Sequence, residues 1–589
     1  MTTVPEAKRA AWRAVGIVVL SLFVAIYAWW PVLAAWENTQ WGDGQAFHKL
    51  VEAARWSLVR YKELPLWDPY ECGGRPLWDN PQSMASSPII LFFTPLLGTG
   101  KTMKLWYILH TAAGFASMWL FCRRDLKVQR AAAFAGATAW ACCGFNMHHM
   151  SGGHASFVAF EFMPVALLLW REAETKVASA IWLGFVVAIA STTGGALPLL
   201  YIAVLLGGET LARIWPPKRL LAVLKAGAIT LAVTLGVGAA RLLPTIDQLM
   251  HHKRALGQDL DHMTVQAFFD AFLNRHIGHM AHAPGLVYVW GEYAAYIGWI
   301  LFVLAIAGVI LGGLEHAWLF AIGLLGCALM TGYWSPYSPW GILNKYVYPL
   351  KEMRVPGRFG AHASLVLIAY AALATDRLGP ALRRIVARIP RLRSQSGLAS
   401  ALRLVVLLVA VLGAGDVVGR GMQLVHEMGA GSGPQRRVPA SKNLFYGGEA
   451  GFIEGPSQNR GRLACYDEWG FYAGAPMWEG DLPQVRVVDP AATITQSSRT
   501  QNTFSVQVEA PTATTLLLNS SYDFNWRSSV GTPIERQKLL AVDIPAGTHT
   551  IKVRYWPRTL TIGLILTLFT TLISIRALRR IARGQHPLR

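Results

Sequence analysis

Charged residues are scarce in this chain. Asp, Glu, Lys and Arg make up 15% of the 589 residues and hydrophobic residues 53%, whereas roughly a quarter of a soluble domain is charged. This scarcity excludes an ordinary soluble protein and indicates an integral membrane protein. The mean hydropathy of +0.33 is modest for a bare helix bundle, so a sizeable polar portion must accompany the membrane spans.

Cysteine is also rare. The 6 cysteines show no metal-ligand spacing, and Cys142 and Cys143 lie inside an apolar run. A disulfide framework is therefore not expected. Cys72 and Cys465 are the one pair that could meet, and the sequence does not decide whether they do.

The sequence also lacks a continuous basic face. The formal net charge is +20, but Lys and Arg stand in short clusters beside apolar runs, which is typical of membrane topology and not of nucleic-acid binding. We expect no nucleic-acid partner. A nucleotide-binding loop is excluded as well, because LLGTGKT at 96–102 has Pro95 where the motif needs its first glycine.

Long apolar runs are abundant. The first, Ala14 to Trp36, is longer than a signal-peptide core and predicts an uncleaved anchor. The others lie near 104–122, 131–147, 155–170, 177–193, 196–212, 220–240, 292–313, 316–332, 360–375, 401–418 and 558–575. The sequence thus predicts about twelve transmembrane helices. The run at 89–97 is too short to span and is expected to be re-entrant or interfacial.

The basic residues test this assignment, because Lys and Arg accumulate on cytoplasmic loops. They cluster at 122–130, around Arg213, Lys218 and Arg219, at 377–393 and in the C-terminal tail. All these segments fall on one side of the predicted membrane, so both termini are expected in the cytoplasm. The long segments 37–103, 241–291, 333–359 and 419–557 are then extracytoplasmic, and we call them outer loops.

The last outer loop differs from the others in its sequence pattern. TFSVQVEA at 503–510 and HTIKVRYW at 549–556 alternate apolar and polar residues between turn signals, which predicts a small antiparallel β-sandwich. We expect a polytopic α-helical membrane domain at 1–418 and an extracytoplasmic domain at 419–557, β-rich from about 440. The remainder, 558–589, is predicted to be a final transmembrane helix with a basic cytoplasmic tail.

The first outer loop holds carboxylates among glycine and aromatic residues. Asp43 stands between two glycines just beyond the first span, where a ligand or a solvated turn would both suit it. The segment 64–88 repeats Leu-Trp-Asp twice among Gly and Pro residues. Its aromatic faces with nearby Asp, Asn and Gln would suit a sugar, and equally an interfacial anchor.

Three basic residues do not follow the tendency of Lys and Arg to lie on the cytoplasmic side of the membrane. Lys351, Arg354 and Arg358 precede a span on its predicted outer side. An anionic phosphate at the headgroup level would explain them, because Arg matches phosphate oxygens bidentately. Contact with lipid headgroups is the alternative.

Histidine and one acidic residue supply further candidates. MHHMSGGH at 147–154 and HIGHMAH at 276–282 suggest copper or zinc, but neither has a recognised ligand spacing, and solvated or hydrogen-bonded histidines are the alternative. Glu161 lies inside a predicted span, where an ionisable group is costly. It is either functional or a carboxylate at a helix end.

Together these residues resemble the bacterial YfhO-type membrane proteins, which belong to the C-type glycosyltransferase superfamily and take sugars from polyprenyl-phosphate carriers. The resemblance covers most of the chain. It is carried by WGDGQ (41–45), PLWDPYECGGRPLWDNPQS (65–83), GHASFVAFEFMP (153–164), MRVPGRF (353–359), YDFNWRSSVG (522–531) and IPAGTHTIKVRYWP (544–557). The acid departs from the family pattern, with D-G-Q in place of a longer D-x-x-x-Q.

The resemblance implies a helical fold of the superfamily's type and an inverting sugar transfer in a bacterial inner membrane. Asp43 would be the base, and Arg354 and Arg358, assisted by Lys351, would stabilise the phosphate leaving group. Sugar or acceptor contacts would come from Gln45, Trp67, Asp68, Asp79, Asn80, Gln82, His154 and Glu161. The expected partners are a polyprenyl-phosphate-linked sugar, an extracytoplasmic glycan or protein acceptor and membrane lipids. No cofactor is certain, and a divalent ion, Mg or Mn, is optional.

Two other functions remain open. A transporter or lipid flippase would also have about a dozen spans, but carriers usually show two related halves, and we find no internal repeat. A non-catalytic envelope assembly protein would use the β domain to hold a partner.

Overall fold

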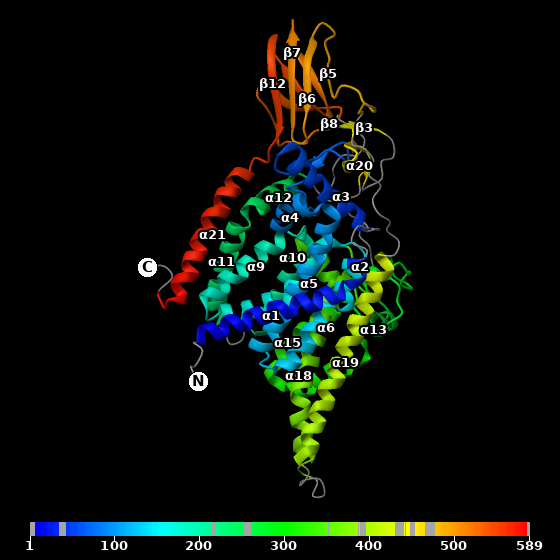
Figure 1. Ribbon diagram of the computed structural model, residues 1–589, viewed down its shortest axis with the longest axis vertical. Helices are drawn as coiled ribbons and strands as arrows, with labels where there is room; N and C mark the ends of the chain where they lie inside the picture. The colour runs from blue at the N-terminus through cyan, green and yellow to red at the C-terminus, as the bar shows by residue number, and fades with distance from the viewer. Residues whose placement is uncertain are drawn as a thin grey trace.

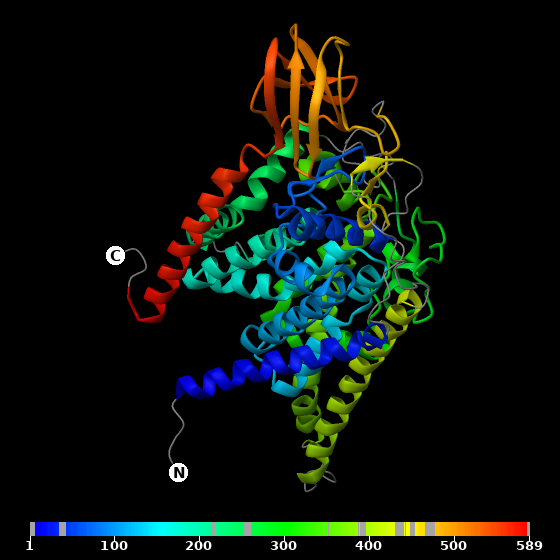
Figure 2. The ribbon, with the colours of Figure 1, turned by 45° about the horizontal axis from the view of Figure 1, so that its top comes forward.

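The computed structural model describes residues 6–34, 43–213, 219–252, 261–351, 353–386, 388, 396–429, 441, 443–447, 454–463, 465 and 477–585. In these ranges the chain builds a helical body and a β domain of C-terminal strands (Figures 1 and 2). The β domain stands at one end of the helical body. The hairpin of α18 (Gly360–Val386) and α19 (Ser396–Gly429) extends to the opposite end.

Seven helical stretches in the described residues are long and apolar enough to cross a membrane. They are Ala11–Ala28 in α1 (Glu6–Ala28), Thr99–Arg124 (α5), Leu220–Val237 (α11), Gly298–Met330, Pro356–Ile385, Ser400–Glu427 and Leu560–Ala582 (α21). Over an apolar stretch of 18 residues in each of α11 and α21, only 17% of the residues are buried inside the protein, which leaves broad apolar faces for lipid. At 23 residues, α21 is about 34 Å long, enough to cross a hydrocarbon core about 30 Å thick. The chain is a multi-pass membrane protein.

Several predicted spans are shorter or broken in the structure. The run near 131–147 forms α6 (Arg130–Ala141) and α7 (Gly144–Ser151), because the Gly144 amide donates to the Tyr296 carbonyl at 2.7 Å instead of continuing α6. The run near 155–170 forms the 3₁₀ helix η2 (Ala155–Phe162) and α8 (Met163–Ala173), with a proline in the first turn of α8. α9 (Val177–Ser191) has only 15 residues. The structure therefore does not confirm about twelve helices of full spanning length among the described residues.

The stretch Gly298–Met330 is a helical hairpin packed on α18. It contains α14 (Gly298–Gly312), the turn η5 (Gly313–His316) and α15 (Ala317–Met330). A Cβ added at Gly308 would overlap the carbonyl of Tyr370, and one at Gly326 would meet His362. The chain thus runs along α18 in one direction and returns along it, as the two sequence runs at 292–313 and 316–332 predict.

Shorter elements complete the helical body. They are α2 (Trp30–Ala34), α3 (Asp43–Trp56), the π-helix η1 (Ser57–Tyr61), α4 (Pro88–Leu97), α10 (Ala196–Arg213), α12 (Ala239–His251), α13 (Val265–Leu273), η4 (Trp290–Glu292), α16 (Pro339–Tyr346), α17 (Tyr348–Lys351), η6 (Pro356–Phe359) and α20 (Glu454–Ser457). The run at 89–97 is the short helix α4, 10 residues long and unable to span, as predicted.

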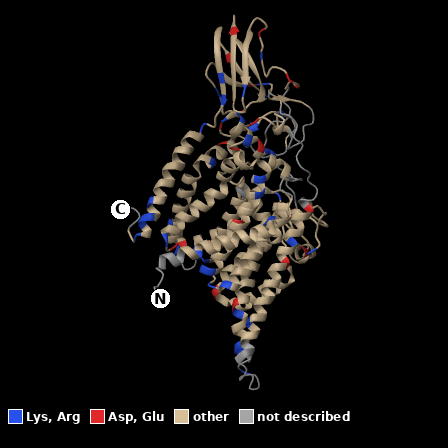
Figure 3. Cartoon of the chain, in the orientation of Figure 1, with Lys and Arg blue, Asp and Glu red and all other residues tan. Residues whose placement is uncertain are grey.

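The ends of several helices meet through ion pairs at the end of the body away from the β domain. Arg171 pairs with Asp125 at 2.7 Å, and Arg377 pairs with Glu315 at 2.9 Å. The Gln129 amide, just before α6, donates to Asp376 of α18 at 3.1 Å. Two of the segments that the charge pattern assigns to one side of the membrane, 122–130 and the start of 377–393, therefore lie at this end of the body. Further Lys and Arg lie toward the tip of the α18–α19 hairpin (Figure 3). Lys218 lies outside the described residues.

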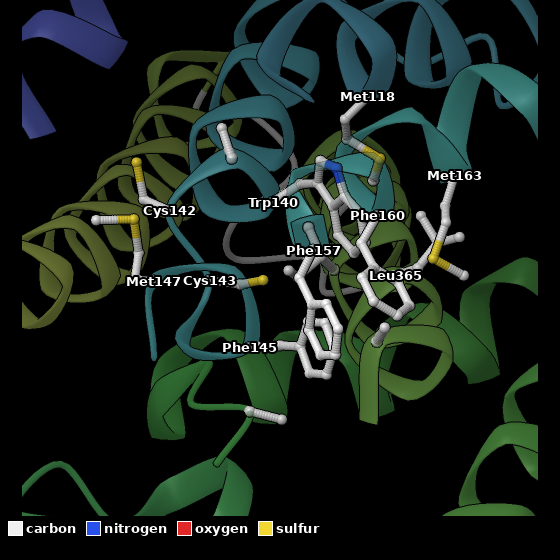
Figure 4. Close-up of a cluster of buried hydrophobic side chains, with 14 of the residues drawn as sticks. Met118, Trp140, Cys142, Cys143, Phe145, Met147, Phe157, Phe160, Met163 and Leu365 are labelled. Atoms are coloured by element: carbon white, nitrogen blue, oxygen red, sulfur yellow. The ribbon is translucent and has the colours of Figure 1, made fainter. Parts of the chain in front are cut away.

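Aromatic and sulfur-bearing side chains fill the core between these helices. Figure 4 shows Trp140, Phe145, Phe157 and Phe160 packed together with Leu365 of α18. All five are at most 7% exposed. This packing fixes α7 and η2 against α18 and so positions the residues at the ends of those two elements, where the candidate site lies.

The β domain consists of two four-stranded antiparallel sheets in the orders β10-β11-β8-β5 and β6-β7-β12-β9. Its strands are β5 (Val485–Val487), β6 (Thr493–Arg499), β7 (Thr503–Ala510), β8 (Thr514–Ser521), β9 (Trp526–Ser528), β10 (Thr532–Arg536), β11 (Leu539–Ile544) and β12 (Gly547–Tyr555). Buried residues of both sheets form one hydrophobic cluster. The alternating segments at 503–510 and 549–556 are β7 and most of β12, which confirms both predicted strands.

The first outer loop is sandwiched between the helical body and the β domain. It contains the two-residue strands β1 (Trp67–Asp68) and β2 (Arg75–Pro76), which pair antiparallel, while β3 (Phe445–Tyr446) and β4 (Arg460–Gly461) pair nearby. The Trp67 amide donates to Asn502 of the β domain at 3.0 Å. A disulfide joins Cys72 to Cys465. The one cysteine pair that the sequence left undecided is therefore disulfide-bonded in the structure.

A buried charge network stiffens this loop. Lys49 of α3 pairs with Glu71, and Arg75 pairs with the same carboxylate at 2.5 Å, while Asp68 lies 3.6 Å from both cations. All four side chains are at most 1% exposed. Burial disfavours the charged carboxylate, but Arg75 and Lys49 outweigh it and lower the pKa of Glu71 to about 2.

Candidate active site

Three segments distant in sequence converge on one polar cluster. His149 lies near the end of α7, and His154 immediately precedes η2. Glu292 ends η4, and Arg358 lies in η6. Arg358 lies in the outer loop 333–359, and Glu292 directly follows the outer loop 241–291. We call these four residues the His–Glu–Arg cluster.

Local backbone geometry returns the chain from His149 to His154. Gly153 has a φ of +94°, a conformation that glycine adopts at little cost. The turn lets the His154 amide donate to the His149 carbonyl at 2.8 Å. As a result, the two imidazole rings face each other across the turn.

Arg358 and Glu292 form the charged half of the cluster. The Arg358 Nε and Nη2 donate to the two carboxylate oxygens of Glu292 at 2.8 and 3.0 Å. Each side chain is only 13% exposed. A bidentate pair of this kind is both strong and directional. The guanidinium also lies over the ring of Phe157, 4.8 Å from its centroid.

The two histidines form the other half. The Nδ1 atoms of His149 and His154 are 2.7 Å apart, and His154 Nε2 lies 3.7 Å from Glu292 Oε1. The rings of Phe145 and Phe157 flank His149, with centroids 4.5 and 4.7 Å from its own. Burial, with a further contribution from His154, lowers the pKa of His149 well below its ordinary value. Burial therefore favours the neutral form of the His149 imidazole.

The second histidine segment approaches the first. The rings of His148 and His279 stack with their centroids 5.9 Å apart. Side chains at Gly152 or Gly291 would collide with the His279 ring. The absence of a side chain at these two glycines therefore allows the His279 ring to approach the first histidine segment. The two histidine motifs, separated by more than a hundred residues in sequence, thus occupy one region of the structure.

The other two basic residues of the sequence prediction lie apart from Arg358. The Arg354 guanidinium carbon is 5.9 Å from the centroid of the Tyr288 ring, and its side chain is half-buried. Lys351 is exposed. The three residues therefore do not form a single cationic surface: Arg358 is paired inside the cluster, while Lys351 faces outward.

The predicted base lies at the start of α3. Asp43 is the first residue of that helix, but its side chain lies outside what the structure describes. Gln45, two residues on, is half-buried. The assignment of Asp43 as base stays a prediction.

Four of the predicted sugar contacts in the first loop are buried. Trp67 packs on Tyr555, with ring centroids 4.6 Å apart, and Asp68 belongs to the charge network described above. Asp79 accepts hydrogen bonds from Gln248 at 3.0 Å and from the Tyr555 hydroxyl at 2.9 Å. Asn80 is fully buried too. Trp67 and Asp79 hold the loop to the β domain through Tyr555, and all four side chains are at most 1% exposed.

The remaining two candidates in this set differ in exposure. Gln82 is half-buried, and its carbonyl lies against Gly194. Glu161 of η2 is fully buried against Gly114 of α5, and neither of its carboxylate oxygens has a hydrogen-bond partner among the described residues. The ion pairs of the His–Glu–Arg cluster do not include it.

Glu292 could not be identified as a site residue from the sequence. It stands in the short segment VWGEY, at the start of an apolar run, and no neighbouring residue marks it as functional. Only the approach of η4 to η6 pairs it with Arg358. In chemical terms the assembled cluster offers two imidazoles, one carboxylate and one guanidinium, which suit binding of anions, protons or a metal ion.

Comparisons with known proteins give structural neighbours only. No protein-family model matches the chain, and no curated protein sequence matches it. Among solved structures, it is similar to the arabinofuranosyltransferase AftD from Mycobacteria, with 15% identity and a TM-score of 0.43 over 70% of this chain. The match covers 27% of AftD, so the chain spans only about a quarter of that protein's length.

A second neighbour is comparable in length. The chain is similar to ArnT from Cupriavidus metallidurans in the apo state, with 17% identity and a TM-score of 0.42. It is also similar to ArnT bound to undecaprenyl phosphate, with 16% identity and a TM-score of 0.41. Both matches cover 78% of this chain and 88% of ArnT.

Proposed function

We propose that this protein is a membrane glycosyltransferase that moves a sugar from a polyprenyl-phosphate carrier to an extracytoplasmic acceptor. One observation carries the proposal. Two segments on which the family resemblance rests, 153–164 and 353–359, meet around Glu292 through His154 and Arg358. A function that draws on both segments explains why they converge.

The proposed reaction is a direct displacement. The acceptor oxygen forms a bond to the anomeric carbon while the bond from that carbon to the phosphate oxygen breaks. The acceptor hydroxyl gives its proton to the Asp43 carboxylate, and polyprenyl phosphate leaves with the bonding electron pair. General base catalysis of this kind contributes roughly 10² to 10⁴-fold in rate, and a single displacement inverts the sugar carbon.

Arginine would stabilise the leaving phosphate. Arg354 is half-buried and has an aromatic ring beside it, where a charge-assisted hydrogen bond to phosphate is stronger than in water. Arg358 already forms an ion pair with Glu292. We therefore assign it mainly to positioning the cluster, and only secondarily to stabilising the leaving phosphate. Lys351 is exposed and suits contact with the lipid headgroup region.

Half-buried polar side chains are the better candidates for sugar or acceptor contacts. Gln45, Gln82 and His154 meet this condition. A fully buried residue such as Trp67, by contrast, would first have to leave its packed position.

We further infer that the β domain and the first loop face away from the cytoplasm. The disulfide between Cys72 and Cys465 supports this sidedness, because disulfides persist in oxidising compartments and are rare in the cytosol. The ion-paired helix ends near Asp125 and Glu315 lie at the other end of the body, which fits a cytoplasmic face rich in Lys and Arg.

The proposal is tested by transfer of radiolabelled sugar from polyprenyl phosphate in membranes that contain the wild type, Asp43→Asn or Arg354→Ala. Lys345→Ala is the matched control for Arg354, because Lys345 is an exposed basic residue of the same outer loop. Asp481→Asn, at an exposed carboxylate near the β domain, is the control for Asp43. Expression and folding of each variant are checked first.

We expect labelled product from the wild type and both controls, and a loss of roughly a hundredfold or more from Asp43→Asn. Equal labelling by all variants would remove Asp43 and Arg354 from the site. No labelling by the wild type across a panel of donors and acceptors would favour a transporter instead.

A further inference from the structure

The His–Glu–Arg cluster contains a set of atoms suited to a metal ion. His149, His154 and Glu292 each offer one ligand atom, and these atoms all lie within 4.8 Å of one another. His149 is 1% exposed, and the side chains of His154 and Glu292 are each 13% exposed. Among the described residues, no other group of three such side chains meets this condition.

The surroundings of His149 favour a ligand. Its Nδ1 faces His154 at 2.7 Å, while its Nε2 is buried without a hydrogen-bond partner in the described part of the chain. A buried polar atom without a partner costs free energy. Coordination of an ion through His149 Nε2 would offset that cost, with Nδ1 keeping its contact with His154, and the rings of Phe145 and Phe157 already hold His149 in place.

The charged pair supports the site in a different way. A carboxylate accepts hydrogen bonds at about four lone-pair positions, so Glu292 can keep its two bonds from Arg358 and still offer an oxygen to an ion. Metal-binding side chains are usually oriented by such outer partners. Arg358 would play that part for Glu292.

The donor types decide which metal fits. Two imidazole nitrogens and one carboxylate oxygen are a ligand set that zinc adopts, with a fourth position left open. Magnesium and manganese favour carboxylate, carbonyl and water oxygens. We propose that His149, His154 and Glu292 bind a single zinc-type divalent ion, in place of the magnesium or manganese considered from the sequence.

The proposal does not depend on the proposed sugar transfer, because binding is measured without donor or acceptor. Full-length protein is purified without a polyhistidine tag, stripped with chelator and dialysed against Zn²⁺, and bound metal is counted by mass spectrometry. Co²⁺ serves as a spectroscopic probe, since the intensity of its visible bands reports the coordination geometry. The variants are His154→Ala and the isosteric Glu292→Gln. The control is His276→Ala, an exposed histidine of the second histidine motif.

We expect about one tightly bound zinc per chain for the wild type and for His276→Ala. Loss of a ligand should weaken binding by more than the roughly 10- to 100-fold that outer partners contribute. Excess Mg²⁺ should not displace zinc. Three results would each overturn the proposal: no stoichiometric zinc in the wild type, undiminished binding by both site variants, or equal competition by Mg²⁺. Folding of both site variants is checked first, and if one of them fails to fold, the other decides the outcome.

Discussion

The ion pair between Glu292 and Arg358 should contribute far more to stability than an exposed pair of the same chemistry. Two hydrogen bonds of 2.8 and 3.0 Å join the groups, and each side chain is 13% exposed. Removing one partner leaves the other charged and largely buried. Glu292→Gln alone should therefore lower the free energy of unfolding by about 3 to 5 kcal/mol.

A double-mutant cycle isolates the pair itself. Two unit charges about 4 Å apart attract each other by about 4 kcal/mol at an effective dielectric constant of 20. Part of that is offset by desolvation, so we expect a coupling of about 2 to 3 kcal/mol between Glu292→Gln and Arg358→Met. The pair of Arg377 and Glu315, with side chains 30% and 67% exposed, provides the control, and its coupling should be about 0 to 1 kcal/mol.

The assay is equilibrium unfolding in mixed micelles, with chelator present so that bound metal does not contribute. The four proteins of each cycle are measured under identical conditions. A coupling for Glu292 and Arg358 no larger than that of the exposed control would refute the reasoning. It would mean that this cluster is hydrated in the native protein and that Arg358 is not held by its partner.

Three further outcomes follow from packing, titration and the disulfide. Gly308→Ala should destabilise the protein by roughly 1 to 3 kcal/mol, because the new Cβ would overlap the Tyr370 carbonyl. Gly207→Ala is the control, at an exposed helical site with nothing within 4 Å, and it should be neutral or stabilising. Thermal unfolding of the two variants compares them. Burial, followed by repulsion from a second carboxylate, raises the pKa of Asp79 from 3.8 to about 7, so its contribution to stability is present at low pH and is lost as the pH rises from about 4 to about 7. Asp79→Asn should flatten the measured fall in stability over that range, and an unchanged slope would contradict the shift. Wild-type protein should resist a thiol-specific mass label at Cys72 until it is reduced, and labelling without reductant would show that the bond is absent.

Much of the fold could be predicted from hydropathy and alternation, because both depend on nearby residues. The strands at 503–510 and 549–556 and the short helix at 89–97 appear where the patterns place them. The number of full-length spans could not be predicted. Apolar runs such as 131–147 are interrupted by contacts with distant backbone, as at Gly144 and Tyr296, and hydropathy carries no information about those contacts.

The candidate site was only half visible in the sequence. Arg358 stood out because it broke the charge rule, and the histidines stood out by their clustering. Glu292 carries no local signal, and its pairing with Arg358 across more than sixty residues is a product of tertiary packing. The same holds for the disulfide, whose two cysteines are separated by 393 residues.

Composition alone does not distinguish two possible roles for the first outer loop. Aromatic rings beside Asp and Asn are typical of sugar-binding surfaces, and equally of a packed interface between domains. Burial separates the two cases: Trp67 and Asp79 are at most 1% exposed, and both contact Tyr555 of the β domain. No property of the loop's own sequence reveals that the β domain covers it.

The most direct test of the central claim is which donor the purified protein consumes. Wild-type protein in liposomes is given an envelope extract as acceptor, with the same labelled sugars supplied either on polyprenyl phosphate or on a nucleotide. We expect that label moves from the lipid carrier, with release of polyprenyl phosphate, and that none moves from the nucleotide. Transfer from the nucleotide alone, or an intact lipid carrier across every sugar offered, would contradict it.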